Sequence, residues 1–467
     1  MFSITPAKVA EVLNAELLVF DEHGVNAPVL RVHSDTRSLQ NGDLFIAIIG
    51  ERFDGHDYLE LAAQNGAIAA LVDEQIVADK KLSENSPLTL ISVADTLAAL
   101  GALSAWNRSQ FKQPLLAITG SAGKTSVKTM AAHVLSGMGP CLATRGNLNN
   151  HIGAPLTLCE LSESNSSAVI ELGASAVGEI AYTANFAKPD VVILTNVSGA
   201  HLEGFGSIEN IAKTKGEIID AVCVEGTAIL NRDDQFFDQW LQRAGNKKVV
   251  SFGLTAEADI YASDIHCSAS GSEFSVHYDG QTEAAYVSLL GQHNVVNALS
   301  VIAATVAMGM SLQDVVAALR NLPEVPGRLQ ASAGFAGMKV IDDSYNASPA
   351  SVRAAIDVLK LYDQKTWLVL GDMAELGEAF ITTHQEIGVY AKEAGIDTLV
   401  ATGTGGQSTV EAFAENAHWM ADKNQVVEYL KNNVKPGQVV LIKGSRSAGM
   451  DEVVKALTVP ATNGEEE

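Results

Sequence analysis

The sequence LLAITGSAGKTSVKTMAAHVL, residues 115–135, contains the strongest local signal in the chain. An apolar run at 115–118 leads directly into a glycine-rich turn, and Lys124 and Thr125 follow that turn. Apolar residues then recur at 127, 130, 131, 134 and 135, which is the spacing of one helix face. The stretch therefore predicts a strand, a tight turn and a helix in immediate succession.

A turn of this kind can hold an anion. Glycines let the backbone turn tightly, so that successive N–H groups and the helix N-terminus point at one phosphate. Lys124 would reach the terminal phosphates and the Thr125 hydroxyl a magnesium ion. Ile118 stands where the usual phosphate loop has its first glycine, so an ordinary strand-to-helix turn is the alternative. The strand, the Gly-Lys-Thr triplet and the helix are in register, which favours a nucleoside triphosphate.

Outward from this stretch, short β-branched runs alternate with helical patterns from about residue 93 to the C-terminus. This alternation is typical of βαβ units, so the predicted fold class is α/β with a mostly parallel sheet. Strands are expected at 115–119, 168–172, 191–196, 228–231, 339–342, 367–370, 398–401 and 439–443. Helices are expected at 95–106, 294–308 and 312–319.

Three domains are expected. The segment LPEVPGR at 322–328 follows a long helical pattern and marks a boundary near residue 327. The first eighty or so residues instead carry short strands at 29–32 and 42–46 between turn-rich segments, which suggests a small α+β domain. The polar stretch DKKLSENSP, 79–87, is a plausible linker. The expected domains are therefore 1–87, 88–327 and 328–467.

Composition narrows the class of protein. The chain has 467 residues, 47% of them hydrophobic and 18% charged, which is typical of a globular enzyme. Its 31 basic and 55 acidic residues give a net charge of −24, which argues against nucleic acid or an anionic membrane as the main partner. The four cysteines form no C-x-x-C pair, and neither a signal peptide nor a long apolar run is found. We therefore expect a cytoplasmic protein without membrane insertion.

Two polar groups follow strand-like segments beyond the glycine-rich turn. Glu171 ends an apolar run, and His201 follows another. Ligands of α/β sheets gather at the carboxyl ends of strands, where both would lie. Glu171 is suited to magnesium, although a salt bridge explains it equally well. For His201 alone, a simple loop histidine is the favoured interpretation.

At this point the chain resembles the Mur ligases, the ATP-dependent amide ligases that build the peptidoglycan precursor. The TGSAGKT loop, 119–125, is similar to the shortened phosphate loop of that family. Further similar blocks are GNLNNHIGAP (146–155), IELGA (170–174), AHLEGFGS (200–207), AKTKGEI (212–218), GQHNVVNAL (291–299), PGRL (326–329), DDSYNASP (342–349), GDMAELG (371–377) and KGSRSAGM (443–450).

The resemblance implies a three-domain α/β fold: a small α+β N-terminal domain, a central P-loop ATPase domain, and a Rossmann-like C-terminal domain. It implies that ATP is bound by the loop residues and by groups further along the chain, which are Thr119, Gly120, Ser121, Ala122, Gly123, Lys124, Thr125, Ser126, Asn294, Asn297, Arg328 and Asp343. Helix capping is the alternative for Asn294, and a less suitable one for Asn297. Arg328 would bring positive charge to the terminal phosphate, and Asp343 would bind the ribose.

Two magnesium ions are implied as well. Thr125 and Glu171 would hold the first, and His201 and a carbamylated lysine the second. Carbamylation turns a cation into an oxygen donor, which is what a hard cation prefers. Lys213 and Lys215 are both candidates, and the family spacing to Ile218 favours Lys215. A helix-surface lysine is the alternative for either.

The activity implied by the resemblance joins D-alanyl-D-alanine to UDP-N-acetylmuramoyl-tripeptide through an acyl phosphate. Lys124, Lys215, His201 and Arg328 would form the catalytic set. The D-N-P-R block of diaminopimelate-adding relatives is absent, which supports addition of the dipeptide. Substrate binding is expected from Ser34, Asp35, Thr36, Arg37, Arg52, Asn147, Asn149, Asn150, Tyr345, Asn346, Lys443, Ser445 and Arg446. For Arg37 and Arg52, ordinary turn residues are an equal alternative.

Other functions explain fewer of the sequence motifs than an amide ligase does. A phosphotransferase or switch NTPase explains the phosphate loop but leaves 342–349 and 443–450 without a purpose. The third-residue-adding ligase and folylpolyglutamate synthetase are disfavoured by the GNLNN and KGSRS blocks. A catalytically dead protein is expected to lack Lys124, Glu171 or His201, and all three are present. A structural α/β protein does not explain the spread of motifs. We expect a monomer.

Overall fold

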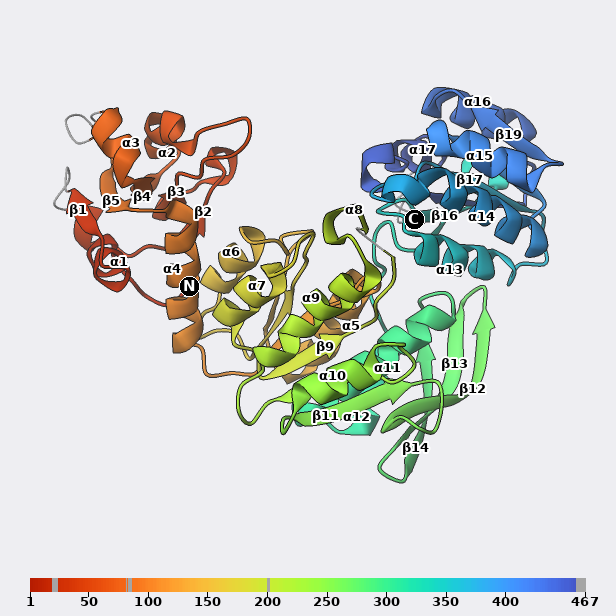
Figure 1. The fold of residues 1–467 in the computed structure, drawn as a ribbon, viewed down its shortest axis with the longest axis horizontal. Coiled ribbons are helices and arrows are strands. Elements are labelled where there is room, and N and C mark those ends of the chain that lie inside the picture. The colour runs from red at the N-terminus through yellow and green to blue at the C-terminus, as the bar shows by residue number, and fades with distance from the viewer. Residues whose placement is uncertain (19–23, 81, 83–85, 200–201, 459–467) are drawn as a thin grey trace, which may run out of the picture.

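The structure, a computed structural model, describes residues 1–18, 24–80, 82, 86–199 and 202–458. Three lobes follow one another along the chain, each built on its own sheet (Figure 1). In that view the first and third lobes stand at opposite ends, with the second between them. The α/β fold class with three domains is confirmed.

The first lobe has a five-stranded sheet in the order β1-β5-β4-β3-β2, in which only the β1–β5 pair is antiparallel. Helices α1 and α4 (Thr96–Gln110) pack on one face, and α2 and α3 on the other. The strands are β1 (Glu16–Leu18), β2 (Arg31–His33), β3 (Asp43–Ile46), β4 (Ala67–Asp73) and β5 (Thr89–Val93), and the other helices are α1 (Pro6–Leu13), α2 (Leu59–Gln64) and α3 (Glu74–Asp79).

The expected domain boundary at residue 87 separates β5 from its own sheet. β5 pairs in parallel with β4 over five residues and antiparallel with β1, so the first sheet continues to Val93. Leu100 and Leu103 of α4 also pack in the core of this lobe. The chain therefore leaves the first lobe along α4 and not within the polar stretch 79–87, because burial of β5 outweighs local composition.

The second lobe has a nine-stranded sheet in the order β14-β13-β12-β11-β10-β9-β6-β8-β7. Strands from β7 to β12 run parallel, and β12, β13 and β14 form antiparallel pairs that the sequence analysis did not predict. The strands are β6 (Leu115–Thr119), β7 (Cys141–Ala143), β8 (Ser167–Glu171), β9 (Val191–Leu194), β10 (Thr227–Asn231), β11 (Lys248–Gly253), β12 (Ile260–Ser268), β13 (Gly271–Tyr278) and β14 (Gln281–Val287).

Helices cover both faces of this sheet, which explains why β6, β8 and β9 are buried at every position. One core contains α5 (Lys124–Leu135), α11 (Gln292–Ala307) and α12 (Leu312–Leu319). The other contains α6 (Gly153–Cys159), α7 (Glu179–Ala187), α9 (Ile208–Asp220) and α10 (Phe237–Ala244). The short α8 (Leu202–Phe205) precedes α9.

The third lobe has a six-stranded sheet in the order β15-β16-β20-β17-β18-β19, parallel except for β15. The core changes between Val325, which packs in the second lobe, and Leu329, which packs in the third. The strands are β15 (Gln330–Ala333), β16 (Lys339–Asp343), β17 (Thr366–Leu370), β18 (Thr398–Thr402), β19 (Ala417–Met420) and β20 (Val439–Lys443), and the helices are α13 (Pro349–Leu359), α14 (Phe380–Glu393), α15 (Thr404–Phe413), α16 (Lys423–Asn433) and α17 (Asp451–Leu457).

No helix in the described part of the chain is long and apolar enough to cross a membrane. All four cysteines are free thiols.

Candidate active site

The glycine-rich turn lies between β6 and α5, as the sequence predicts. Gly123 has φ +83°, and a Cβ there would lie 2.5 Å from Oδ1 of Asn297. The turn is held from the neighbouring strand end, because Asn196 accepts hydrogen bonds from the N–H groups of Ser121 (2.9 Å) and Ala122 (3.0 Å). The first N–H groups of α5 lack partners within the helix and form a site suited to a phosphate.

Lys124 is the first residue of α5, and its side chain folds back over the turn. Its Nζ donates to the carbonyls of Gly120 (2.6 Å) and Ser121 (3.3 Å). Burial lowers the pKa of Lys124, and the positive charge of Arg328 acts in the same direction, while Glu171 opposes it. An ammonium held in this way can exchange carbonyl partners for phosphate oxygens without moving far.

Glu171 ends β8 beside this turn and is 1% exposed. Its Oε1 accepts hydrogen bonds from Asn149 (2.7 Å) and from the Thr125 hydroxyl (3.4 Å). Its Oε2 lies 3.3 Å from Nζ of Lys128 in an ion pair, without hydrogen-bond geometry to any described residue. A buried carboxylate whose Oε1 lies next to a threonine hydroxyl at the cavity fits a magnesium ion.

The donor set is sparse, as magnesium sites in phosphate-binding proteins often are. Within the described ranges, no three His, Cys, Asp or Glu side chains gather as a metal cluster. Magnesium typically keeps several waters and is bound by one or two carboxylates and substrate phosphates, so Glu171 and Thr125 suffice for one ion. His201, the expected ligand of the second ion, lies outside the described residues.

The two candidate lysines on α9 differ sharply in their surroundings. Lys213 is exposed, whereas Lys215 is 1% exposed. Nζ of Lys215 donates to the Ala174 carbonyl at 3.2 Å and lies 5.5 Å from the centre of the Phe205 ring. Burial lowers the pKa of Lys215 to about 7, and the charge of Lys124 adds to this effect. Of the two lysines, only Lys215 is therefore buried beside the elements that carry the cavity.

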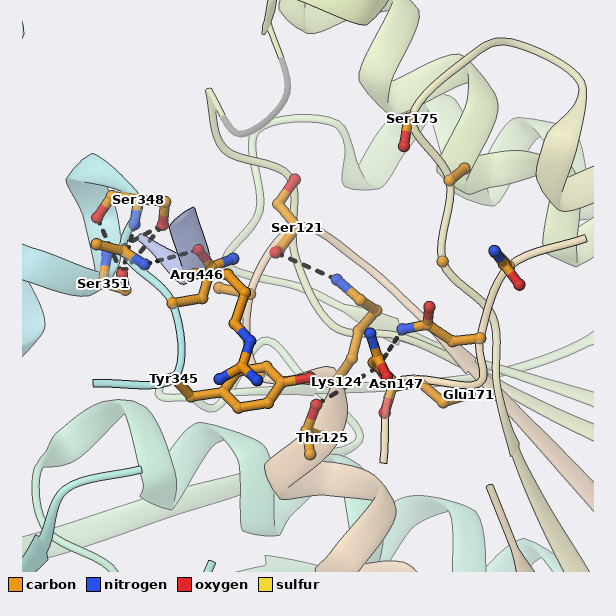
Figure 2. A pocket seen from close by; sticks show the side chains of 18 of the residues that line it. Ser121, Lys124, Thr125, Asn147, Glu171, Ser175, Tyr345, Ser348, Ser351 and Arg446 are labelled. Atoms are coloured by element: carbon orange, nitrogen blue, oxygen red, sulfur yellow. Dashed lines mark hydrogen bonds between the residues drawn. The ribbon is translucent and has the colours of Figure 1, made fainter. Parts of the chain in front are cut away.

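A cavity of about 400 Å³ opens between the second and third lobes (Figure 2). Lys124, Thr125 and Glu171 lie on one side of it, and Tyr345 and Arg446 lie on the other. The expected site residues that line it are Ser121, Ala122, Gly123, Lys124, Thr125, Asn147, Asn149, Asn150, Glu171, Arg328, Tyr345, Asn346 and Arg446. Side chains from the second and third lobes thus line the same cavity.

A second cavity of about 360 Å³ shares the glycine-rich turn and Arg328 with the first. Its walls include Ser126, Asn294, Asn297 and Asp343. Asn297 donates to Oδ1 of Asn294 at 3.0 Å, and Asn294 donates to the Leu290 carbonyl at 2.8 Å. The helix begins at Gln292 with Gly291 as its N-cap, so Asn294 is not a capping residue.

Arg328 borders both cavities. Its guanidinium carbon lies 4.4 Å from the centre of the Tyr345 ring, and Arg446 approaches the same ring at 5.8 Å. Nε of Arg328 is buried and finds no hydrogen-bond partner among the described residues. A partly buried guanidinium whose Nε lacks a partner is suited to an anionic ligand in the adjoining cavity.

Lys443, which is expected at the dipeptide, is paired with a carboxylate, and its role stays a prediction. It is 1% exposed and donates to Asp343 (2.5 Å) and to the Asn346 carbonyl (2.9 Å), and it borders the second cavity. Because β16 and β20 are parallel neighbours with Asp343 opposite Lys443, the strand register pairs the two charges. Ser445 instead lines a third cavity of about 370 Å³ with Asn346, Ser348 and Arg446.

Several expected residues lie elsewhere. Thr119 is fully buried and donates to the Leu172 carbonyl at 2.8 Å. In the first lobe, Arg37 forms an exposed ion pair with Asp35, and Arg52 is exposed. None of the first-lobe candidates, which are Ser34, Asp35, Thr36, Arg37 and Arg52, lines the three cavities described above. Asn150 lines the first cavity, and its Oδ1 accepts a hydrogen bond at 2.8 Å from the N–H of Gly153, the first residue of α6.

Sequence reasoning missed other lining residues. Ser351 borders both of the first two cavities and belongs to the capping box of α13 with Ser348. The S-P-x-S spacing at 348–351 was the available signal. Lys128, the ion-pair partner of Glu171, lies four residues after Lys124 and hence near the same helix face.

The fold and these cavities define a P-loop nucleotide-binding protein of three α/β domains. The sequence matches the Mur ligase family, catalytic domain at residues 29–108, the Mur ligase middle domain at 118–305, and the Mur ligase, glutamate ligase domain at 327–446. The chain belongs to the Mur ligase family.

Individual relatives extend this similarity over the whole chain. The UDP-N-acetylmuramoyl-tripeptide--D-alanyl-D-alanine ligase of Escherichia coli strain K12 is 40% identical over 98% of this chain and 99% of its own length. The ligase of the same name from Bacillus subtilis strain 168 is 34% identical over 91% of this chain and 92% of its own.

Solved structures agree with the sequence matches. MurF from Acinetobacter baumannii superposes with a TM-score of 0.89 at 31% identity, covering 97% of this chain and 98% of that one. MurF ligase from Thermotoga maritima in complex with ADP gives 0.82 at 27% identity, covering 92% and 97%.

Proposed function

We propose that this chain is an ATP-dependent amide ligase that joins D-alanyl-D-alanine to UDP-N-acetylmuramoyl-tripeptide and so makes a pentapeptide precursor of peptidoglycan. The observation that carries the proposal is the cavity of about 400 Å³, which is lined by Lys124 and Glu171 of the second lobe, by Arg446 of the third lobe, and by Arg328 between them. The names of the relatives from Escherichia coli and Bacillus subtilis support the same substrates. We propose the cytoplasm as its location and a monomer as its state.

ATP would lie across the two cavities that share the turn. Its phosphates would meet the N-terminus of α5 and Lys124, while adenosine would occupy the second cavity beside Asn294 and Asn297. Asp343 is the carboxylate available to the ribose, and its charge is already balanced by Lys443. The structure of MurF ligase from Thermotoga maritima in complex with ADP supports this nucleotide.

Thr125 and Glu171 would hold one magnesium ion, and His201 with carbamylated Lys215 would hold a second. Magnesium would supply positive charge that neutralises the phosphate oxygens during transfer. Carbamylation requires a neutral amine: the Lys215 nitrogen attacks the carbon of CO₂ and loses one proton, which leaves a carbamate anion. The buried position of Lys215 and its pKa of about 7 support that assignment.

The reaction proceeds in two steps. The terminal carboxylate of the tripeptide attacks the γ-phosphorus of ATP, and ADP departs, which leaves an acyl phosphate. Lys124 and Arg328 stabilise the charge that develops, since both are partly buried cations that line the cavity. The amine of the dipeptide then attacks the acyl carbon, phosphate leaves, and the nitrogen loses a proton to form the amide.

The two other substrates would be bound by other residues of the cavities and by residues of the first lobe. Asn147, Asn149 and Asn150 would face the tripeptide end of the UDP-linked substrate, and first-lobe residues 34–37 and 52 would meet its nucleotide. The dipeptide would enter by the third cavity, where Ser445 and Arg446 offer a hydroxyl and a charge to its carboxylate.

The direct test is to incubate the purified chain with ATP, magnesium, UDP-N-acetylmuramoyl-tripeptide and D-alanyl-D-alanine, and to measure phosphate release and product mass. Each substrate is omitted in turn, and Lys124→Met serves as the inactive control. Phosphate release that requires both acceptors, with a pentapeptide product, establishes the ligase. ATP hydrolysis that is indifferent to both refutes it and favours a switch NTPase.

A further inference from the structure

Lys128 is a buried cation that the mechanism above does not use. It lies on α5 one helical turn beyond Lys124 and is 5% exposed. Lysine is almost never buried without a partner, because removing its charge from water is costly. Two contacts offset that cost: an ion pair with Oε2 of Glu171 at 3.3 Å and a hydrogen bond to the Gly146 carbonyl at 3.1 Å.

The two carboxylate oxygens of Glu171 have different partners. Oε2 faces Lys128, while Oε1 faces Thr125 and Asn149 and hence the cavity. Rotation of the carboxylate would break contacts on both sides at once. Lys128 therefore holds the orientation of the carboxylate plane, with one oxygen turned toward the ammonium and the other toward the cavity.

The second contact reaches the loop that carries the cavity's asparagines. Gly146 precedes Asn147 and Asn149, and the loop is tied down again where Gly173 N–H donates to the Asn149 carbonyl at 2.8 Å. Asn149 in turn donates to Oε1 of Glu171. One ammonium group thus links the carboxylate of the proposed metal site to the loop of the proposed substrate site.

We propose that Lys128 is a positioning residue that orients Glu171 toward magnesium and couples this carboxylate to the 146–150 loop. This inference rests on the proposed function. Partners that orient a metal ligand change metal affinity by about 10–100-fold when removed. We therefore expect Lys128→Met to raise the magnesium concentration needed for tight nucleotide binding by about tenfold or more.

The experiment measures ADP affinity by isothermal titration calorimetry over a series of magnesium concentrations. Lys128→Met is compared with Lys128→Arg and with Lys392→Met, an exposed helix lysine far along the chain. The magnesium midpoint rises most in Lys128→Met, less in Lys128→Arg, and stays unchanged in Lys392→Met. ADP affinity without magnesium stays within about twofold, because the turn itself is intact.

A second measurement follows the loop. Amide hydrogen exchange in peptides that cover residues 144–152 is expected to speed up in Lys128→Met but not in Lys392→Met, while peptides from the third lobe stay unchanged. Faster exchange throughout the molecule with an unaltered magnesium midpoint would show a purely structural role and overturn the inference.

The outcomes separate this inference from the function on which it rests. If the unsubstituted chain does not bind ADP at all, the proposed function fails. If it binds ADP and the magnesium midpoint is the same in every variant, only the role of Lys128 fails. Should Lys128→Met not fold, the Lys128→Arg midpoint decides, since a planar guanidinium cannot repeat both contacts of the ammonium.

Discussion

Lys215 allows the sharpest test of the proposed chemistry, because its burial makes a quantitative difference to its reactivity. A pKa of about 7 leaves about half of the amine neutral at pH 7, against roughly one part in 3,000 at the ordinary value of 10.5. Only the neutral amine attacks CO₂. We therefore expect Lys215 to form a carbamate at neutral pH and exposed Lys213 not to do so.

The direction of the pH effect follows from the same shift. Below about pH 7 Lys215 is protonated, so carbamate formation and activity in limiting CO₂ fall as the pH is lowered. Between pH 7 and 10.5 the unfolded chain binds more protons at this lysine than the folded chain does, so the stability of the unmodified protein rises with pH in that window.

The assay combines labelling with activity. The protein is stripped of CO₂ at low pH and returned to neutral pH with ¹³C-bicarbonate, and a carbamate signal is sought by ¹³C NMR. Lys215→Met should lose the signal and at least about a hundredfold in activity, since even the partners of a metal ligand are worth 10–100-fold. Lys213→Met is the matched control and should keep both. A signal that persists in Lys215→Met, or disappears in Lys213→Met, would refute the reasoning.

Three further substitutions test other parts of the site. Gly123→Ala should weaken ADP binding about tenfold or more by calorimetry, because a φ of +83° strains alanine and its Cβ would crowd Asn297; unchanged affinity would contradict this. Arg446→Gln should raise KM for the dipeptide about tenfold, since a hydrogen bond to a charged group is worth about 1.5–3 kcal/mol. ADP affinity should stay unchanged. An unaltered KM in initial-rate measurements would exclude Arg446 from the dipeptide site. Asp343→Asn should lower the free energy of unfolding in urea by about 3–5 kcal/mol, because it leaves Lys443 charged and buried without its partner; a loss below about 1 kcal/mol would show that the pair is not structurally important.

The parts of the fold that sequence predicts best are those with strictly local signals. The strand at Leu115–Thr119 and the helix from Lys124 lie where the pattern put them, because the turn needs glycine at a left-handed φ and leaves little freedom. The antiparallel strands β12 to β14 were missed, although alternating residues and the Asp279-Gly280 turn between Tyr278 and Gln281 indicate a hairpin. They join the central sheet through a short parallel pairing of β12 with β11, at Phe252–Ile260 and Gly253–Tyr261, which no local pattern indicates.

The candidate site shows the same limit. Lys124, Glu171 and Arg328 meet in one cavity, and their roles stay predictions. Lys443 was expected at the dipeptide because it ends a strand, but the register between β16 and β20 places it opposite Asp343. The pairing of Asp343 with Lys443 depends on which strands become neighbours. No local segment of the sequence indicates that β20 lies between β16 and β17.

Arg328 lies between Val325 and Leu329, where the core changes from the second lobe to the third, and it lines both of the first two cavities. The boundary between the two hydrophobic cores therefore does not separate the residues that line the proposed active site. A chimera that joins the third domain of one ligase to the first two of another has to choose which parent supplies residues 326–329. The parent that supplies the third domain would then set the proposed acceptor preference. The parent that supplies residues 326–329 would provide Arg328 and its proposed contact with the triphosphate.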